Sequence, residues 1–300
     1  MNDPAIWLIL LMLISGKLYR QWRVVEPAQA AVVLNRYVID IALPALIIVA
    51  LRDLQWQADL IGLVATPWLL TLIMAALIVW LARLYQWPDG VTGVLLLLVP
   101  LGNTAFLGYP IVTALLGEVA LPAAVIYDQF GSFLLLSSYG LFIAARYGSQ
   151  ESISLRLIVM RILRFPPFIA LIIALLPLPW PSTVLSAFSM IGASLVPVAC
   201  FAVGLQWRIR LPRRHWSPLI HGLSAKLVLM PLLAWLWLWL MQTDHGLLAV
   251  GVLQSGMPSM ITAGAIAVSA GLDEELSAAL VGSGLIVALF SLALWQWLLV

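Results

Sequence analysis

Long apolar runs recur along the whole chain, separated by short polar stretches. A run of about 18 residues or more can cross the hydrocarbon core as a helix. The first run is the weakest, because it spans the membrane only if Lys17 and Arg20 extend their charges to the interface. The pattern predicts an all-α integral membrane protein with ten transmembrane helices, over residues 4–20, 36–51, 59–82, 92–116, 120–145, 164–180, 183–206, 216–241, 246–270 and 276–299.

Two of the predicted helices, the fourth and the ninth, carry helix breakers and polar groups near their middle. Backbone groups freed at membrane depth persist only where they are buried in protein or line a watery cavity. The alternative is a pair of tolerated proline kinks. We expect a substrate-binding site in these two stretches, formed by Asn103, Thr104, Gly108, Tyr109, Pro110, Gln254, Ser255, Gly256, Pro258 and Ser259.

Each stretch contains a proline that cannot donate a backbone hydrogen bond. Pro110 is expected to release the carbonyl of Phe106, and Pro258 that of Gln254. Two broken helices crossing at mid-depth would offer peptide amides to an anion and carbonyls to a cation. This arrangement is typical of secondary transporters.

The two halves of the chain resemble each other. Residues 41–48 resemble residues 194–201, and residues 108–110 resemble residues 256–258. Five predicted helices separate the members of each pair, and because five is odd the second half enters the membrane from the opposite side. We therefore expect two inverted five-helix repeats, residues 1–147 and 148–300, joined by the short polar junction at residues 147–152.

Composition and charge placement support a membrane protein of defined orientation. The chain is 63% hydrophobic and 9% charged, with a mean hydropathy of +1.07. Basic residues cluster in alternate loops, whereas Arg52 stands alone in the opposite set, so the positive-inside rule places both termini outside. A bacterial inner membrane is the expected location. Basic residues of the inner loops are Lys17, Arg20, Arg23, Arg36, Arg83, Arg146, Arg156, Arg161, Arg164, Arg208, Arg210, Arg213 and Arg214.

Tryptophans gather where helices 8 and 10 end, on the predicted outer face. We interpret them as an aromatic belt at the membrane interface. They are Trp235, Trp237, Trp239, Trp295 and Trp297.

Three ionisable residues lie within predicted spans: Asp40, Asp128 and Lys226. Each costs about 2.5–3.5 kcal/mol at a helix centre and so needs a partner or a function. Asp128 is the candidate carrier of a coupling proton or sodium ion, or else a brace for broken helix 4. Asp40 is a second coupling candidate, or pairs with Arg36 one turn away. Lys226 contacts a substrate carboxylate or pairs permanently with Asp40 or Asp128.

Several other chemistries are excluded or disfavoured. The single cysteine, Cys200, allows no intramolecular disulfide, and the three histidines lack metal-ligand spacing. No phosphate-binding loop, HExxH motif or nucleophile elbow occurs, so no cofactor, enzyme activity or direct use of ATP is expected. A nucleic-acid partner is not expected either. An intramembrane aspartyl protease and an anion channel are the alternatives.

The motifs resemble the auxin efflux carrier family, within the bile acid and sodium symporter-like superfamily. The resemblance runs through nearly the whole chain. Its most specific part is residues 103–110 with Gly117, followed by Tyr127-Asp128-Gln129. The other matching segments are residues 16–20, Asn35 with residues 42–46, Pro197 with Gly204, residues 227–231, and Met257-Pro258.

The resemblance implies two domains and an elevator-type mechanism. Helices 1, 2, 6 and 7 would form a scaffold, and helices 3–5 and 8–10 a transport domain with helices 4 and 9 crossing at the site. Organic anions are the implied substrates, although the short junction departs from the long loop of many plant members and makes auxin an unexpected cargo.

Together, the residues and the resemblance predict a secondary active transporter of a small carboxylate or dicarboxylate, driven by a proton or sodium gradient. Its other expected partner is the lipid bilayer, and a homodimer is one assembly that the sequence allows.

Overall fold

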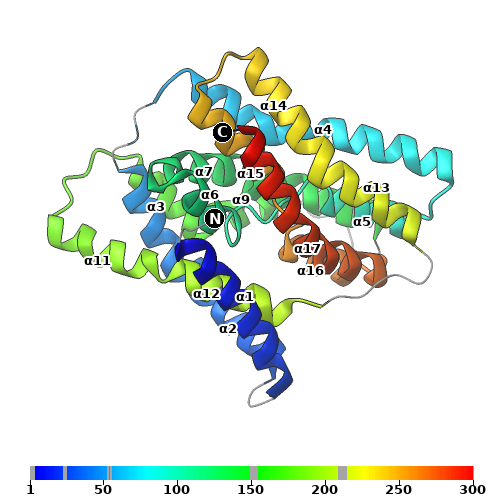
Figure 1. The fold of residues 1–300 in the computed structure, drawn as a ribbon, viewed down its shortest axis with the longest axis horizontal. Coiled ribbons are helices and arrows are strands. Elements are labelled where there is room, and N and C mark those ends of the chain that lie inside the picture. Colours follow the sequence, from blue (N-terminus) through cyan, green and yellow to red (C-terminus); the bar gives the residue numbers. More distant parts are fainter. Residues whose placement is uncertain are drawn as a thin grey trace. The chain divides into compact units, whose positions relative to one another are not determined.

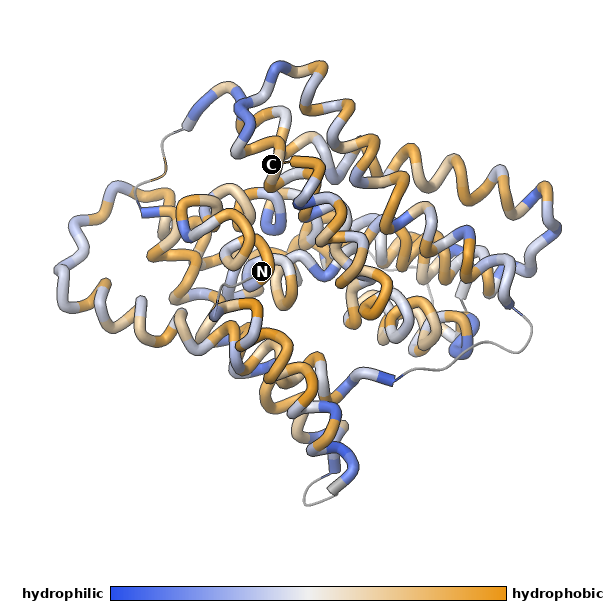
Figure 2. Tube along the Cα trace, in the orientation of Figure 1, coloured by the Kyte–Doolittle hydropathy of each residue, from blue (hydrophilic) through white to orange (hydrophobic). Residues whose placement is uncertain are grey.

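The computed structural model describes residues 4–22, 26–52, 54, 56–148, 155–208 and 215–299. Within these ranges the secondary structure is entirely helical, apart from one isolated β-bridge. Figure 2 shows hydrophobic residues along the helices and hydrophilic residues mostly at their ends. Among the described residues, six helices are long and apolar enough to cross a membrane: Pro27–Leu51, Asp59–Tyr85, Glu118–Tyr147, Ser182–Gln206, Trp216–Leu240 and Glu274–Leu299. The chain is a multi-pass, all-α membrane protein.

The helices belong to two compact units. Unit 1 comprises Met1–Trp56, Ala105–Val125 and Val159–Trp207, and unit 2 comprises Gln57–Thr104, Ile126–Ile158 and Arg208–Val300. Two helices continue from one unit into the other, α7 (Leu121–Tyr127) and α9 (Leu155–Leu163).

Unit 1 is organised around the pairing of its first and last helices. A Cβ added at Gly16 of α1 would meet the Phe201 carbonyl, and one added at Gly204 of α12 would meet the Leu13 carbonyl. The two glycines thus let the backbones of α1 and α12 approach closely. The elements of unit 1 are α1 (Pro4–Trp22), α2 (Pro27–Tyr37), π-helix η1 (Val38–Ala42), α3 (Leu43–Leu51), α6 (Gly108–Leu116), 3-10 helix η2 (Glu118–Ala120), α10 (Pro166–Ala174), α11 (Ser182–Ala193) and α12 (Leu195–Gln206).

Unit 2 contains the remaining helices, and α14 packs against both α4 and α15 within it (Figure 1). Three of its segments are π-helical, a wider turn that recurs at functional sites. The elements are α4 (Asp59–Tyr85), α5 (Asp89–Leu98), π-helices η3 (Asp128–Phe133) and η4 (Leu136–Gly140), α8 (Leu141–Tyr147), α13 (Trp216–Ser224), π-helix η5 (Ala225–Leu229), α14 (Met230–Leu240), α15 (His245–Ser255), α16 (Ile261–Ser269) and α17 (Glu274–Leu299).

Most predicted spans coincide with helices, but the sixth does not. The expected helix over residues 164–180 is shorter in the structure, where Arg164 and Phe165 lie outside a helix and α10 ends at Ala174. Phe165 is extended (ψ 117°) because the residue before a proline is disfavoured in the α region. Pro177, Pro179 and Pro181 then prevent the helix from continuing. The second span also starts earlier than expected, at Pro27.

Some charges and the repeat junction used for the orientation and domain predictions lie outside the described residues. These are Arg23, Asp53, residues 149–152, Arg210, Arg213 and Arg214.

The predicted aromatic belt requires exposed side chains, and Trp235, Trp239 and Trp297 are exposed. It is wrong for Trp237 and Trp295, whose indole N–H groups donate inward to the carbonyls of Gly62 (3.1 Å) and Leu227 (3.1 Å). A tryptophan near a span end therefore can serve the protein interior as well as the interface.

A close contact between α4 and η3 yields a stability prediction. A Cβ added at Gly131 would overlap the ring of Pro67, which cannot move away because it is part of the α4 backbone. We expect Gly131→Ala to destabilise the protein by about 1–3 kcal/mol, the usual range for overpacking. Gly140→Ala is the matched control, since its added Cβ meets nothing nearer than 3.5 Å. Thermal unfolding of the two purified variants in detergent would measure their stabilities. Equal unfolding temperatures for Gly131→Ala and Gly140→Ala would contradict this packing.

Candidate functional site

The fourth predicted span is interrupted in the structure. Helix α5 ends at Leu98 and α6 begins at Gly108, so residues 99–107, the first break, are outside α-helix. Pro100 cannot donate to the Leu96 carbonyl, and the Tyr139 hydroxyl donates to it instead (3.0 Å). Pro110 lies in the first turn of α6, where a proline is tolerated. The interruption is therefore centred on residues 100–104, ahead of Pro110.

The ninth predicted span is interrupted as well. Helix α15 ends at Ser255 and α16 begins at Ile261, which leaves residues 256–260, the second break, outside α-helix. The Gly256 amide donates to the Val252 carbonyl (3.1 Å), and the Met257 amide donates to that of Gln254 (3.3 Å). The Gln254 carbonyl is thus not released by Pro258, contrary to expectation. These two amides are also occupied, so they are not open to an anion in this arrangement.

The two breaks pair with each other inside unit 2. The Asn103 amide donates to the Pro258 carbonyl (2.8 Å), and the Met260 amide donates to the Leu101 carbonyl (2.9 Å). These bonds make the antiparallel bridge between Gly102 and Ser259. Because backbone groups at membrane depth need partners within the protein, this pairing stabilises both breaks.

Side chains reinforce the pairing. The Ser259 hydroxyl donates to the Leu98 carbonyl (2.8 Å), and the Gln254 side-chain amide donates to the Thr104 carbonyl (3.2 Å). All of these residues are buried. The Ser255 hydroxyl bonds within its own helix, to Val252 (2.7 Å).

Several donors at the bridge stay unoccupied. The side-chain amide of Asn103 and the backbone amides of Gly102 and Ser259 make no hydrogen bond to any group in the described ranges. Asn103 is only 4% exposed. These unoccupied donors, clustered at one place, are available to a ligand.

Lys226 places its side-chain amine at the same bridge. It lies in η5 and is buried, and its Nζ contacts the Pro100 carbonyl (3.5 Å) and Met230 Sδ (3.7 Å). A Cβ added at Gly102 would lie 3.0 Å from this Nζ. Lys226 forms no ion pair with a described carboxylate of unit 2, so the alternative of a permanent pair with Asp128 is not seen.

Asp128 lies in η3, and both of its carboxylate oxygens accept hydrogen bonds. Its Oδ1 accepts from the Thr104 hydroxyl, and its Oδ2 accepts from the Gln129 side-chain amide (2.8 Å). Gln129 is fully buried, and its Oε1 has no hydrogen-bond partner. Asp128 is therefore linked to the first break through Thr104.

The other expected site residues lie in unit 1. Gly108, Tyr109 and Pro110 form the buried first turn of α6, where the Tyr109 amide donates to the Ala105 carbonyl (3.4 Å). Asp40 is exposed in η1 and forms no ion pair with the Arg36 side chain. The predicted i, i+4 pair is absent.

Three features of the site were missed in the sequence. Gly102, the bridge residue beside Lys226, and Gln129, the partner of Asp128, were not among the expected site residues, although both adjoin residues that were. The third feature is the π-helical turns, for which the sequence carries no recognised signal.

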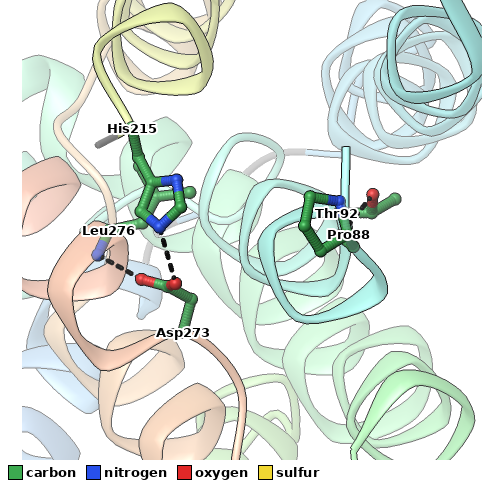
Figure 3. Close-up of polar contacts among 5 residues, drawn as sticks. All are labelled: Pro88, Thr92, His215, Asp273 and Leu276. Carbon is green, nitrogen blue, oxygen red and sulfur yellow. Dashed lines mark hydrogen bonds and ion pairs between the residues drawn. The ribbon is translucent and has the colours of Figure 1, made fainter. Parts of the chain in front are cut away.

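A separate polar contact lies at another end of unit 2. His215 Nε2 is 3.0 Å from Asp273 Oδ2, and Asp273 Oδ1 accepts from the Leu276 amide (2.7 Å), which caps α17 (Figure 3). Thr92 bonds back to the Pro88 carbonyl (3.1 Å) nearby. These are structural contacts of helix termini, and no group of three or more metal-ligating side chains occurs in the described ranges.

The family described as membrane transport protein matches residues 4–296 of this sequence. The chain belongs to this family. It is the family whose motifs the sequence resembles, and its members are transporters and not enzymes.

Two curated relatives are similar over nearly their full length. An uncharacterized transporter of Methanothermobacter thermautotrophicus is 28% identical over 294 residues, covering 96% of this chain and 95% of the relative. An uncharacterized transporter of Methanocaldococcus jannaschii is 24% identical over 311 residues, covering 98% of each.

Proposed function

We propose that this membrane transport protein is a secondary active transporter of a small organic anion, a carboxylate or dicarboxylate. The observation that carries the proposal is the paired breaks, where a buried lysine without a carboxylate partner adjoins unoccupied hydrogen-bond donors. A buried positive charge is costly unless a negative group balances it. A cargo carboxylate would supply that group.

Some residues at the bridge would contact the cargo, and others would hold the two breaks together. Lys226, Asn103 and the amides of Gly102 and Ser259 would hold the carboxylate. Thr104, Gln254, Ser255, Gly256 and Pro258 would keep the two breaks in register. Gly108, Tyr109 and Pro110, the first turn of α6, follow the first break directly in the chain.

Asp128 would carry the coupling proton or sodium ion. It is buried and its partner Thr104 belongs to the first break, so a change in its charge would be transmitted to the site through one hydrogen bond. Asp40 is the weaker coupling candidate, since it is exposed and lies in unit 1.

The architecture proposed for this function has ten spans in two inverted repeats, with helices 4 and 9 crossing at the site and an elevator-type motion of a transport domain. Interruptions at corresponding places of the two halves support it, since they are typical of transporters with inverted repeats. We place the protein in a bacterial inner membrane with both termini outside.

A ligand screen tests this function. Purified protein would be heated with mono- and dicarboxylates, at two pH values and with or without sodium, beside neutral and cationic solutes of similar size. A carboxylate at about 100 times its Kd is expected to stabilise the folded protein by about 2.7 kcal/mol. Shifts with neutral or cationic solutes and none with carboxylates would overturn the anion assignment.

A further inference from the structure

Asp40, Asp128 and Lys226, the three intramembrane candidates for coupling or substrate binding, all lie in π-helical turns. Asp40 is in η1, Asp128 in η3 and Lys226 in η5. A π-turn inserts an extra residue into the helix, so at least one carbonyl loses its usual amide partner. In a membrane that carbonyl must be satisfied from elsewhere in the protein.

At η5 the Leu227 carbonyl, next to Lys226, has no backbone donor four residues ahead, where an α-helix would place one. The Met230 amide donates to Ala225, five residues back, as the π-turn requires. The next candidate donor would be residue 231, a proline, which has no N–H. The indole of Trp295, on α17, donates to the Leu227 carbonyl instead (3.1 Å) and is 9% exposed.

At η3, beside Asp128, another tryptophan donates to a backbone carbonyl of the turn. The Leu134 amide donates to the Gly131 carbonyl, three residues back. The indole of Trp68, on α4, donates to the Phe130 carbonyl (2.9 Å). The adjacent Pro67 packs on Gly131, which fixes α4 against this turn.

We propose that Trp295 and Trp68 are positioning residues that hold the π-turns of Lys226 and Asp128 in place through these indole–carbonyl hydrogen bonds. Each indole donates its N–H to a backbone carbonyl and not to the ionisable side chain, so it acts through the backbone of the turn. The functional importance of both turns rests on the transport function proposed above. The two indole–carbonyl hydrogen bonds do not depend on the transport function, and their effect on the turns can be measured without a cargo.

The position of Lys226 can be followed directly, because Lys17 and Lys226 are the two lysines of the chain. In a Lys17→Arg background, ¹³Cε-labelled lysine gives a single NMR signal from Lys226 in the full-length protein. We expect Trp295→Phe, which removes the N–H but keeps an aromatic ring, to shift this signal or split it. The control is Trp297→Phe, on the same helix but 75% exposed, which should leave it in place.

A second variant separates the hydrogen bond from general packing. Pro231→Ala restores a backbone N–H that can donate to Leu227, so the turn no longer needs the indole. In the Pro231→Ala background, Trp295→Phe is expected to move the Lys226 signal by less than half the displacement that it causes in the protein with Pro231. If Trp295→Phe alone does not fold, the double variant should. An unmoved signal in Trp295→Phe, an equal displacement in both backgrounds, or a double variant that also fails to fold would overturn the proposal for Trp295.

Asp128 can be followed by its reaction with dicyclohexylcarbodiimide, which labels buried carboxylic acids, with mass spectrometry as the readout. We expect Trp68→Phe to increase the labelling rate at Asp128 at least threefold, because the loosened turn admits the reagent. Trp80→Phe, on the same helix and 59% exposed, is the control and should not change it. Equal rates in both variants would overturn the proposal for Trp68.

Discussion

Lys226→Met is expected to raise the thermal stability of the protein and to abolish carboxylate binding. The buried ammonium makes only one long contact to a carbonyl and one to a sulfur, and no ion pair with a described residue. Methionine has a similar length and no charge to desolvate. Replacing buried charge by apolar groups is often stabilising, by about 1–4 kcal/mol. Differential scanning fluorimetry with and without a carboxylate ligand would measure both effects.

The control is Lys17→Met, at the only other lysine. Its ammonium lies 4.1 Å from the centre of the Trp207 ring and is partly exposed, so its loss should leave carboxylate binding intact. A Lys226→Met protein that unfolds at a lower temperature would show that the lysine has a structural partner. Unchanged carboxylate binding would remove Lys226 from the site.

Asp128→Asn is expected to abolish uptake driven by a proton or sodium gradient. Asparagine keeps the size of the side chain and can still accept a hydrogen bond from Thr104, but it can neither carry the charge nor bind the proton. Reconstituted vesicles with an imposed gradient would measure driven uptake of a carboxylate found in the ligand screen. We expect a loss of at least about 100-fold, equivalent to about 2.7 kcal/mol.

Asp40→Asn is the matched control. Asp40 also lies in a π-helical turn, but it is exposed and belongs to unit 1. Its substitution should leave driven uptake within about twofold of the unsubstituted protein. Loss of driven uptake in Asp40→Asn with retention in Asp128→Asn would transfer the coupling role to Asp40.

The sequence located both breaks because glycine, proline and polar residues are conspicuous within apolar runs. It placed the first interruption slightly too far along the chain. Pro110 was predicted to break the helix, but the structure places it in the first turn of α6. Pro100 and Gly102 lie within the break. A proline at a helix start and one at a helix end look alike in sequence.

The sequence could not decide which polar groups would meet. It left Lys226 with three candidate partners, and the structure shows it beside Pro100 and Gly102 with no carboxylate. It also assigned Trp295 to the membrane interface, whereas its indole is turned inward to Leu227. Both results depend on contacts between residues 68 or more positions apart, which no local pattern encodes.

The sequence by itself determined the membrane class, most of the spans and the two interruptions, because hydrophobic length and helix breakers act locally along the chain. Only the tertiary structure decided that the breaks pair through a bridge between Gly102 and Ser259, and that Asp128 and Lys226 lie in π-helical turns. The physical reason is that a backbone group freed in the membrane is satisfied by whichever distant donor the packing brings to it.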